Sequence, residues 1–191
     1  MPVPDEDLTL GLDVPAPAER SRAEAPTDRP GASAARAGGR GFVVRTDGAA
    51  RGNPGPASLG VVLISLDRAD ARNPRAAPDA SISEYLGIRT NNVAEYTGVV
   101  RAVELALELG AQRLELLLDS RLIVEQLQGR WRVKDAKLRP LWATALQGLR
   151  RLSGGWTAAH VPRAQNSLAD ALANEAIDRV AAGGPAVVVR R

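Results

Sequence analysis

The stretch from Phe42 to Val62, FVVRTDGAARGNPGPASLGVV, decides the fold of this chain. The apolar run Phe42–Val44 leads to a single carboxylate, Asp47, and a turn rich in glycine and proline follows at 48–56. A second apolar run begins at Leu59. Two apolar runs separated by such a turn predict a β-hairpin. A carboxylate at the end of the first strand is costly to bury unless a positive group meets it, so Asp47 is the first candidate site residue.

The composition narrows the class of protein. The chain has 191 residues, 45% of them hydrophobic, which is enough for one domain of ordinary size plus extra sequence. It contains no cysteine, which excludes disulfides and thiolate metal sites. Residues 1–40 carry five basic and seven acidic side chains, whereas the remainder carries 20 basic and 15 acidic ones. The basic balance of the remainder suits a polyanionic partner.

The sequence shows no sign of a membrane segment. No apolar run approaches the ~20 residues that span a bilayer, and the N-terminus is acidic and proline-rich rather than apolar. We therefore expect a cytoplasmic protein without a membrane partner. Residues 1–40, rich in Pro, Ala and Arg, lack an apolar period and are predicted to be a disordered acidic tail.

The apolar patterns predict an α/β domain over residues 41–182. Strands are expected at 42–46, 58–66, 80–88, 113–118 and 156–161, and helices at 93–109, 120–127, 137–152 and 166–182. Crossover rules make the fourth and fifth strands parallel to the first. The expected sheet is therefore mixed and five-stranded, three antiparallel then two parallel strands, with flanking helices. Residues 183–191 are either a C-terminal tail or an extra edge strand.

Two acids are expected to meet at one edge of this sheet. Asp47 and Asp119 each stand at the carboxyl end of a strand, and neighbouring strands are only ~4.8 Å apart. Two carboxylates that close repel each other unless a cation lies between them or one is protonated. The alternatives are a turn-forming Asp47 before Gly48, and an Asp119 that caps the following helix, with Ser120 sharing that role.

Two further acids begin helices. On a helical wheel Glu95 falls within the apolar arc of its helix, and Asp170 lies at the margin of the apolar arc of the last helix. A carboxylate on the core side of a helix needs a partner. The alternative for both is an exposed position in the first turn, where the helix dipole favours an acid.

The four acids and their neighbours together resemble ribonuclease H of type I. The matching sequence motifs are Asp47-Gly48, Gly52-Asn53-Pro54-Gly55, Thr90-Asn91-Asn92-Val93-Ala94-Glu95, Asp119-Ser120, and His160-Val161-Pro162-Arg163 leading to Asn166 and Asp170. The resemblance covers residues 42 to about 182 and implies the ribonuclease H-like fold. It also implies an endoribonuclease that cleaves the RNA strand of RNA·DNA hybrids, leaving 5′-phosphate and 3′-hydroxyl ends.

The resemblance also implies the site. Two Mg²⁺ ions, or Mn²⁺ as a substitute, would be held by Asp47, Glu95, Asp119 and Asp170, with Asp47 bridging both ions; hard oxygen donors suit these metals. The substrate-binding residues would be Gly48, Asn53, Asn91, Asn92, Ser120 and Asn166. Asparagines in these places can read the 2′-hydroxyl that distinguishes RNA from DNA. The alternative for Asn91 and Asn92 is helix capping.

Two residues compete for a mobile catalytic role. His160, the only histidine, lies ten residues before Asp170, the spacing of family members with a catalytic loop histidine. The motif His160-Val161-Pro162-Arg163 also resembles a branch of the family with a shorter loop, in which an arginine takes the place of the catalytic histidine, and we favour Arg163 for this role. The segment 129–137 is basic but too short for the family's protrusion. We expect its Trp131 to pack on the neighbouring helix, with stacking on nucleic acid as the alternative.

Two rival functions remain open at this point. One is a non-catalytic nucleic-acid-binding module on the same fold, against which the presence of all four acids argues. The other is a nuclease of this fold that acts on another nucleic acid, such as double-stranded RNA. We expect a monomer in either case.

Overall fold

The hairpin predicted from the opening stretch forms the centre of the sheet. The computed structural model describes residues 39–191, so the expected tail lies almost wholly outside the described residues. Strands β1 (Gly41–Ala50) and β2 (Gly55–Ser65) pair antiparallel, with Asp47 opposite Gly60. Strand β3 (Ala80–Arg89) continues the antiparallel meander. Both hairpin strands are longer than predicted because pairing continues into the glycine-rich turn.

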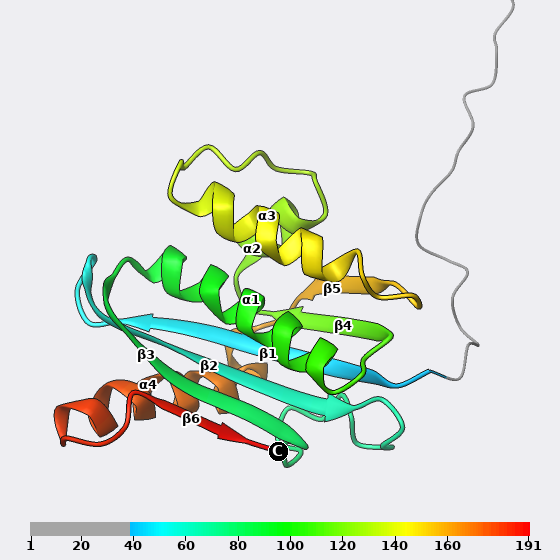
Figure 1. Cartoon of the computed structure of the whole chain (residues 1–191), viewed down its shortest axis with the longest axis horizontal. Helices are drawn as coiled ribbons and strands as arrows, with labels where there is room; N and C mark the ends of the chain where they lie inside the picture. The colour runs from blue at the N-terminus through cyan, green and yellow to red at the C-terminus, as the bar shows by residue number, and fades with distance from the viewer. Residues whose placement is uncertain (1–38) are drawn as a thin grey trace, which may run out of the picture. The chain divides into compact units, whose positions relative to one another are not determined.

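The rest of the chain alternates helices with strands that extend the sheet on the other side of β1 (Figure 1). In order these are α1 (Asn91–Glu108), β4 (Arg113–Leu118), α2 (Arg121–Leu127), α3 (Leu138–Leu149), β5 (Trp156–His160), the 3₁₀ turn η1 (Arg163–Gln165) and α4 (Ser167–Ala181). Strand β4 runs parallel to β1, and β5 parallel to β4, as the crossover rule predicts.

The sheet has six strands, and the prediction of five is wrong in this detail. Strand β6 (Val187–Arg190) pairs antiparallel with β3 and gives the order β5-β4-β1-β2-β3-β6. The edge strand, one of the two expected forms of residues 183–191, is held by Arg179 of α4. Its guanidinium donates to the carbonyls of Ser83 on β3 and Pro185 just before β6, at 2.8 Å each.

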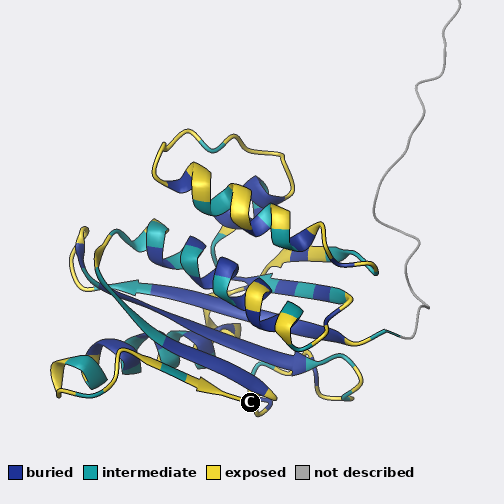
Figure 2. Cartoon of the chain, in the orientation of Figure 1, coloured by how far each residue is buried: buried dark blue, intermediate teal, exposed yellow. Residues whose placement is uncertain are grey.

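Helices cover both faces of the sheet and bury two apolar clusters (Figure 2). The larger cluster joins α1, α2 and α3 to one face, with residues such as Phe42, Leu59 and Leu116 at its centre. The smaller cluster lies on the opposite face under α4 and includes Val43 and Ala169. No helix within 39–191 is both long enough and apolar enough to cross a membrane.

Candidate active site

Asp47 and Asp119 lie where two parallel strands part. The β1–β4 ladder ends at the pair Val44 and Leu116, and each aspartate stands three residues further along the chain, Asp47 within β1 and Asp119 directly after β4. Strand β1 continues beyond this point paired only with β2, so Asp47 is inside β1 and not at its end as predicted. The two acids nevertheless lie at equivalent positions beyond the last β1–β4 pair, at the carboxyl edge of the parallel strands, where α/β sheets place ligand sites.

Two glycines let the helices that carry the other acids approach the hairpin closely. A Cβ on Gly48 would overlap the backbone nitrogen of Glu95 in α1. A Cβ on Gly60, opposite Asp47 in the hairpin, would overlap the carbonyl oxygen of Ala169, the residue before Asp170 in α4. Any side chain at either glycine would push a helix away, so the two glycines fix how near Glu95 and Asp170 come to β1.

The electrostatics show that the four carboxylates share one environment. Asp47 is only 6% exposed, and burial raises its pKa to about 7, with added repulsion from Asp119, Asp170 and Glu95. Burial also raises the pKa of Glu95, and nearby Asp119 adds to that shift, whereas hydrogen bonds from Ser120 and Asn91 oppose it. Acids that perturb one another in this way lie close together, as the sequence predicted.

Each of the other three acids has a polar partner of its own. Arg163 forms an ion pair with Asp170 at 2.9 Å. The amide of Asn91 donates to Glu95 at 2.7 Å, one helical turn away. The buried amide of Asn166 donates both to Asp119 at 2.8 Å and to the carbonyl of Thr46 at 2.9 Å. Asn166 therefore joins the start of α4 to the ends of both parallel strands.

The donor set suits a hard divalent cation, although the side chains are not yet arranged around one. In the described part of the chain no three Asp, Glu, His or Cys side chains form a group that holds a metal as they stand. Asp47 Oδ2 and Asn166 Oδ1 are buried without a hydrogen-bond partner, which is costly for polar oxygens. Carboxylate and amide oxygens are ligands that Mg²⁺ and Mn²⁺ prefer.

The remaining predicted residues lie around this centre. Asn53 Oδ1 accepts from the backbone N–H of Asn91 at 3.2 Å and so ties the glycine-rich turn to α1. The cap of α1 is Thr90, which accepts from the N–H of Val93, so neither Asn91 nor Asn92 caps the helix. Ser120 occupies the N-cap position of α2 without a side-chain cap bond. Capping therefore does not explain the side chains of Asn91 and Asn92.

The two candidates for the mobile role occupy different settings. His160 ends β5, where it pairs in register with Leu118, the residue before Asp119, and its side chain is exposed. Arg163 lies in η1 with 79% of its side chain exposed, and its guanidinium reaches Asp170. Of the two, Arg163 has the direct contact with the acid cluster.

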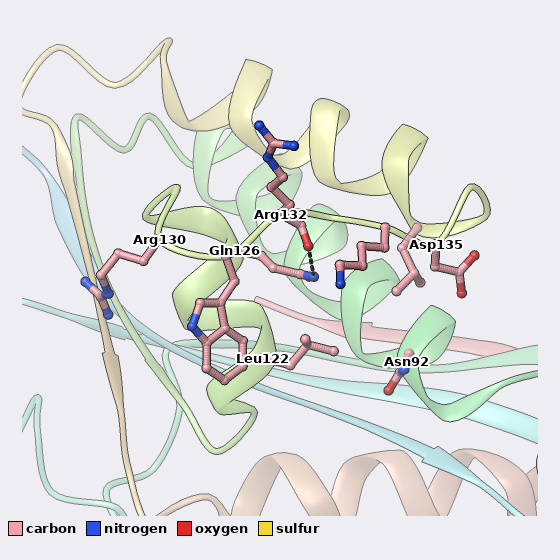
Figure 3. A pocket seen from close by; sticks show the side chains of 9 residues that line it. Asn92, Leu122, Gln126, Arg130, Arg132 and Asp135 are labelled. Carbon is pink, nitrogen blue, oxygen red and sulfur yellow. Dashed lines mark hydrogen bonds between the residues drawn. The ribbon is translucent and has the colours of Figure 1, made fainter. Parts of the chain in front are cut away.

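A basic groove of about 590 Å³ lies beside α1 and α2 (Figure 3). Its lining side chains are Asn92, Leu122, Gln126, Arg130, Trp131, Arg132, Lys134, Asp135 and Leu138. Trp131 is 46% exposed, and the guanidinium of Arg121 lies 5.9 Å from its ring centre, so the prediction of a packed Trp131 is wrong. Asn92, three residues before Glu95, connects the groove to the carboxylates.

The sequence analysis did not identify two buried polar side chains, Gln126 and Arg45. Gln126 accepts from the hydroxyl of Tyr96 at 2.6 Å, and its amide donates to the carbonyl of Arg132, so it holds the groove loop against α1. Arg45, two residues before Asp47, is only 1% exposed. A charged residue inside the run FVVRT was a visible signal for Arg45, whereas Gln126 carried none.

Comparison with known proteins finds relatives that cover the region of this site. The family model described as reverse transcriptase-like matches residues 45–176. The chain is 43% identical over 132 residues to ribonuclease HI of Halobacterium salinarum, covering 69% of this chain and 62% of that protein. It is 41% identical over 142 residues to the bifunctional protein Rv2228c of Mycobacterium tuberculosis, covering 73% of this chain. That alignment spans only 36% of the mycobacterial protein.

Solved structures match the same region. The N-terminal RNase H domain of the M. tuberculosis protein, solved as a fusion with maltose-binding protein, aligns with a TM-score of 0.64 and 38% identity, over 71% of this chain and 97% of that chain. LC11-RNase H1 in complex with an RNA/DNA hybrid aligns with a TM-score of 0.65 and 36% identity, over 73% of this chain and 99% of that one. With these matches over most of residues 45–176, the chain belongs to the ribonuclease H family.

Proposed function

We propose that this protein hydrolyses the RNA strand of RNA·DNA hybrids, leaving 5′-phosphate and 3′-hydroxyl ends. The observation that carries the proposal is the gathering of Glu95, Asp119 and Asp170 around a buried Asp47, whose pKa burial and repulsion raise to about 7. Such crowding of negative charge is unfavourable for stability alone and marks a functional site. The structure of LC11-RNase H1 with a hybrid supports the choice of substrate.

The same four carboxylates would hold Mg²⁺, or Mn²⁺ in its place. Bound divalent ions would supply activation of the attacking water and stabilisation of the leaving 3′ oxygen. The protein's part is to keep the carboxylates fixed relative to one another. Gly48 and Gly60 do this through the close packing of α1 and α4 on the hairpin, and Asn166 through its bonds to Asp119 and Thr46.

Arg163 is suited to neutralise the negative charge of the scissile phosphodiester. Its side chain is 79% exposed and flexible enough to exchange Asp170 for a phosphate oxygen. That exchange would also release Asp170 to bind a cation. His160 ends β5 and forms no ion pair or hydrogen bond with an acid within residues 39–191, so we assign it no more than a supporting role in proton transfer.

Recognition of the two strands falls to different parts of the surface. Asn53 and Asn91, joined through the N–H of Asn91, lie beside Glu95 and are suited to contact the 2′-hydroxyls of RNA. Gly48 and Ser120 border the same acids. The groove with Trp131 and its arginines is suited to the other strand, because cations and an exposed ring bind phosphates and sugars without sequence preference.

The direct test uses the full chain with end-labelled substrates. Hybrid, double-stranded RNA and double-stranded DNA are incubated with Mg²⁺, with Mn²⁺ or with a chelator. We expect cleavage of the RNA strand of the hybrid only, lost on chelation, with products whose 3′ ends a polymerase extends. Binding of the hybrid without cleavage would instead support a non-catalytic module, and preferred cleavage of double-stranded RNA would reassign the substrate.

A further inference from the structure

Arg45 is a buried cation without a counter-ion. It lies on β1 two residues before Asp47, so both side chains point to the α4 face of the sheet, and it is only 1% exposed. Within residues 39–191 it forms no ion pair with a carboxylate. Its guanidinium donates instead to two backbone carbonyls, those of Gln165 at 2.8 Å and Arg72 at 3.0 Å, while its Nε has no partner.

An arginine in this position is expensive for folding. Burial lowers the pKa of Arg45, which shows that the surroundings disfavour its charge. The next residue on this face of β1, Val43, packs in the α4-side cluster with no such penalty. An apolar side chain would fit the layer more cheaply, so the bonds of the guanidinium are the feature that needs an explanation.

The first of these bonds fastens the turn that precedes α4. Gln165, the residue whose carbonyl accepts from Arg45, is followed directly by Asn166, which donates to Asp119 and to the carbonyl of Thr46. Two consecutive residues of the turn are therefore tied to two consecutive residues of β1. Within residues 39–191 Arg163, two residues before Gln165, forms no hydrogen bond or ion pair with β1, and we expect it to depend on this anchorage for its place beside Asp170.

The second bond, from Arg45 to the carbonyl of Arg72, connects β1 to another segment of the chain. Arg72 belongs to the connection between β2 and β3, and its own guanidinium forms a two-pronged pair with Glu115 of β4 at 2.7 and 2.9 Å. One buried side chain thus links three segments far apart in the sequence. Charge-assisted bonds to fixed carbonyls hold geometry better than apolar contacts, which permit sliding.

We propose that Arg45 is a positioning residue that holds the segment Arg163–Asn166 in register with Asp47 and Asp119, and through it the groups that act on the phosphodiester. The inference rests on the proposed hybrid cleavage. It assigns Arg45 no contact with substrate. Its effect should therefore pass through Arg163 and Asn166, and this dependence can be measured.

A double-mutant cycle tests the dependence. Arg45→Lys keeps the positive charge but replaces the planar guanidinium, with its several N–H donors, by a single ammonium group. The ammonium cannot reach the carbonyls of both Gln165 and Arg72. We expect it to lower kcat on the hybrid about tenfold, with KM changed less than about twofold, because small misplacements of catalytic groups are costly. In an Arg163→Ala background the same substitution should lower kcat only about threefold or less, since coupled residues are not additive. Equal losses in both backgrounds would overturn the proposal.

The matched control is Arg179→Lys. Arg179 is also a poorly exposed arginine that donates to two backbone carbonyls, but it anchors the segment before β6, away from the acids. We expect a lower melting temperature and an unchanged kcat. If Arg45→Lys behaves in the same way, Arg45 has only a structural role.

Amide hydrogen exchange gives a readout that needs no activity. Arg45→Lys should speed exchange at residues 163–166 and leave 187–190 unchanged, and Arg179→Lys should do the reverse. Unchanged exchange at 163–166 would refute the anchorage itself. A wild-type protein that fails to cleave the hybrid would overturn the proposed function, whereas the exchange result would still decide the role of Arg45.

Discussion

The carboxylate site and the basic groove are neighbours built on opposite principles. The carboxylates sit on strands and helix starts, and Asp47 is buried against backbone that leaves no room for a Cβ at Gly48 or Gly60. The groove loop, residues 129–137, is mostly exposed, and side chains of the flanking helices donate to its carbonyls: Gln126 to Arg132, and Arg139 to Val133 and Lys134. One region is closely packed and crowded with negative charge, whereas the other is exposed to solvent.

The contrast matches the demands of the two tasks. Chemistry on a phosphodiester depends on fixed distances, so its groups belong on rigid elements. Holding a nucleic-acid backbone depends on summed electrostatic attraction and stacking, which tolerate movement. Substitutions in the carboxylate site should therefore affect kcat, and substitutions in the groove should affect KM.

The largest effect is expected from Asp47→Asn. Loss of the central carboxylate should lower kcat by about 10³-fold or more, which corresponds to roughly 4 kcal/mol of transition-state stabilisation. Binding of the hybrid should be retained because the groove is intact. Steady-state kinetics and a binding titration measure the two quantities. The control is Asp178→Asn, an exposed acid of α4 paired with Arg51, and equal losses in both variants would remove Asp47 from the chemistry.

A smaller loss is expected from Arg163→Ala. Removing an exposed cation that meets the phosphate should lower kcat about tenfold to a hundredfold, since a hydrogen bond to a charged group contributes ~1.5–3 kcal/mol. His160→Ala, measured in parallel, should cost less than about threefold on the same scale. If the histidine variant proves the more damaged, the roles of the two residues are exchanged and the chain does not act as a short-loop enzyme.

The groove should respond differently to substitution. Trp131→Ala removes the exposed ring beside Arg121 and is expected to raise KM about fivefold, because stacking on a base contributes ~1–3 kcal/mol. The kcat at saturating hybrid should stay within about twofold of the parent value. Ile88→Ala, which trims another exposed apolar side chain, serves as the control. A fall in kcat without a change in KM would contradict the division between the two regions.

The smallest effect concerns the stability of the metal-free protein. Asp47 has a pKa of about 7 in the folded chain and about 4 when unfolded, so the folded state binds its proton more tightly. The stabilisation from this group is complete below pH ~4, is lost as the pH rises to ~7, and stays lost above that.

Asp47→Asn removes this penalty, so in a chelator at pH 8 it should melt about 5 °C above the parent, and the difference should shrink towards pH 5. Thermal unfolding of both proteins at the two pH values measures it. Added Mg²⁺ should raise the melting temperature of the parent only, because binding to the folded state stabilises it. A difference independent of pH would contradict the assigned cause.

The sequence predicted the centre of the site better than its supports. Glu95 and Asp170 lie near the starts of helices, Asp119 directly follows β4, and Asp47 lies inside β1, and in all four places local patterns indicate the element and the direction of the side chain. Arg45 could not be placed in this way because its partner Gln165 lies 120 residues away and offers a backbone carbonyl. Any residue supplies such a carbonyl, so no residue type signals it.

The smaller errors have a similar origin. Strand β6 is only four residues long, and its pairing depends on the anchor Arg179, which no local pattern indicates. The side chain of Thr90 caps α1, whereas Asn91 is the first residue of the helix and its amide donates to Glu95. Trp131 was expected to be packed, but the short loop that carries it runs over the surface. For β6, a tertiary contact decided between options that were locally equivalent.

The separation of the four acids depends on the absence of a Cβ atom at Gly48 and at Gly60. One glycine lies beneath α1 and the other beneath α4, on opposite faces of the same hairpin. The spacing of the carboxylates could therefore be changed one helix at a time, by adding a single methyl group under the helix to be displaced. Substitution of either glycine would change the position of one helix without altering a carboxylate side chain.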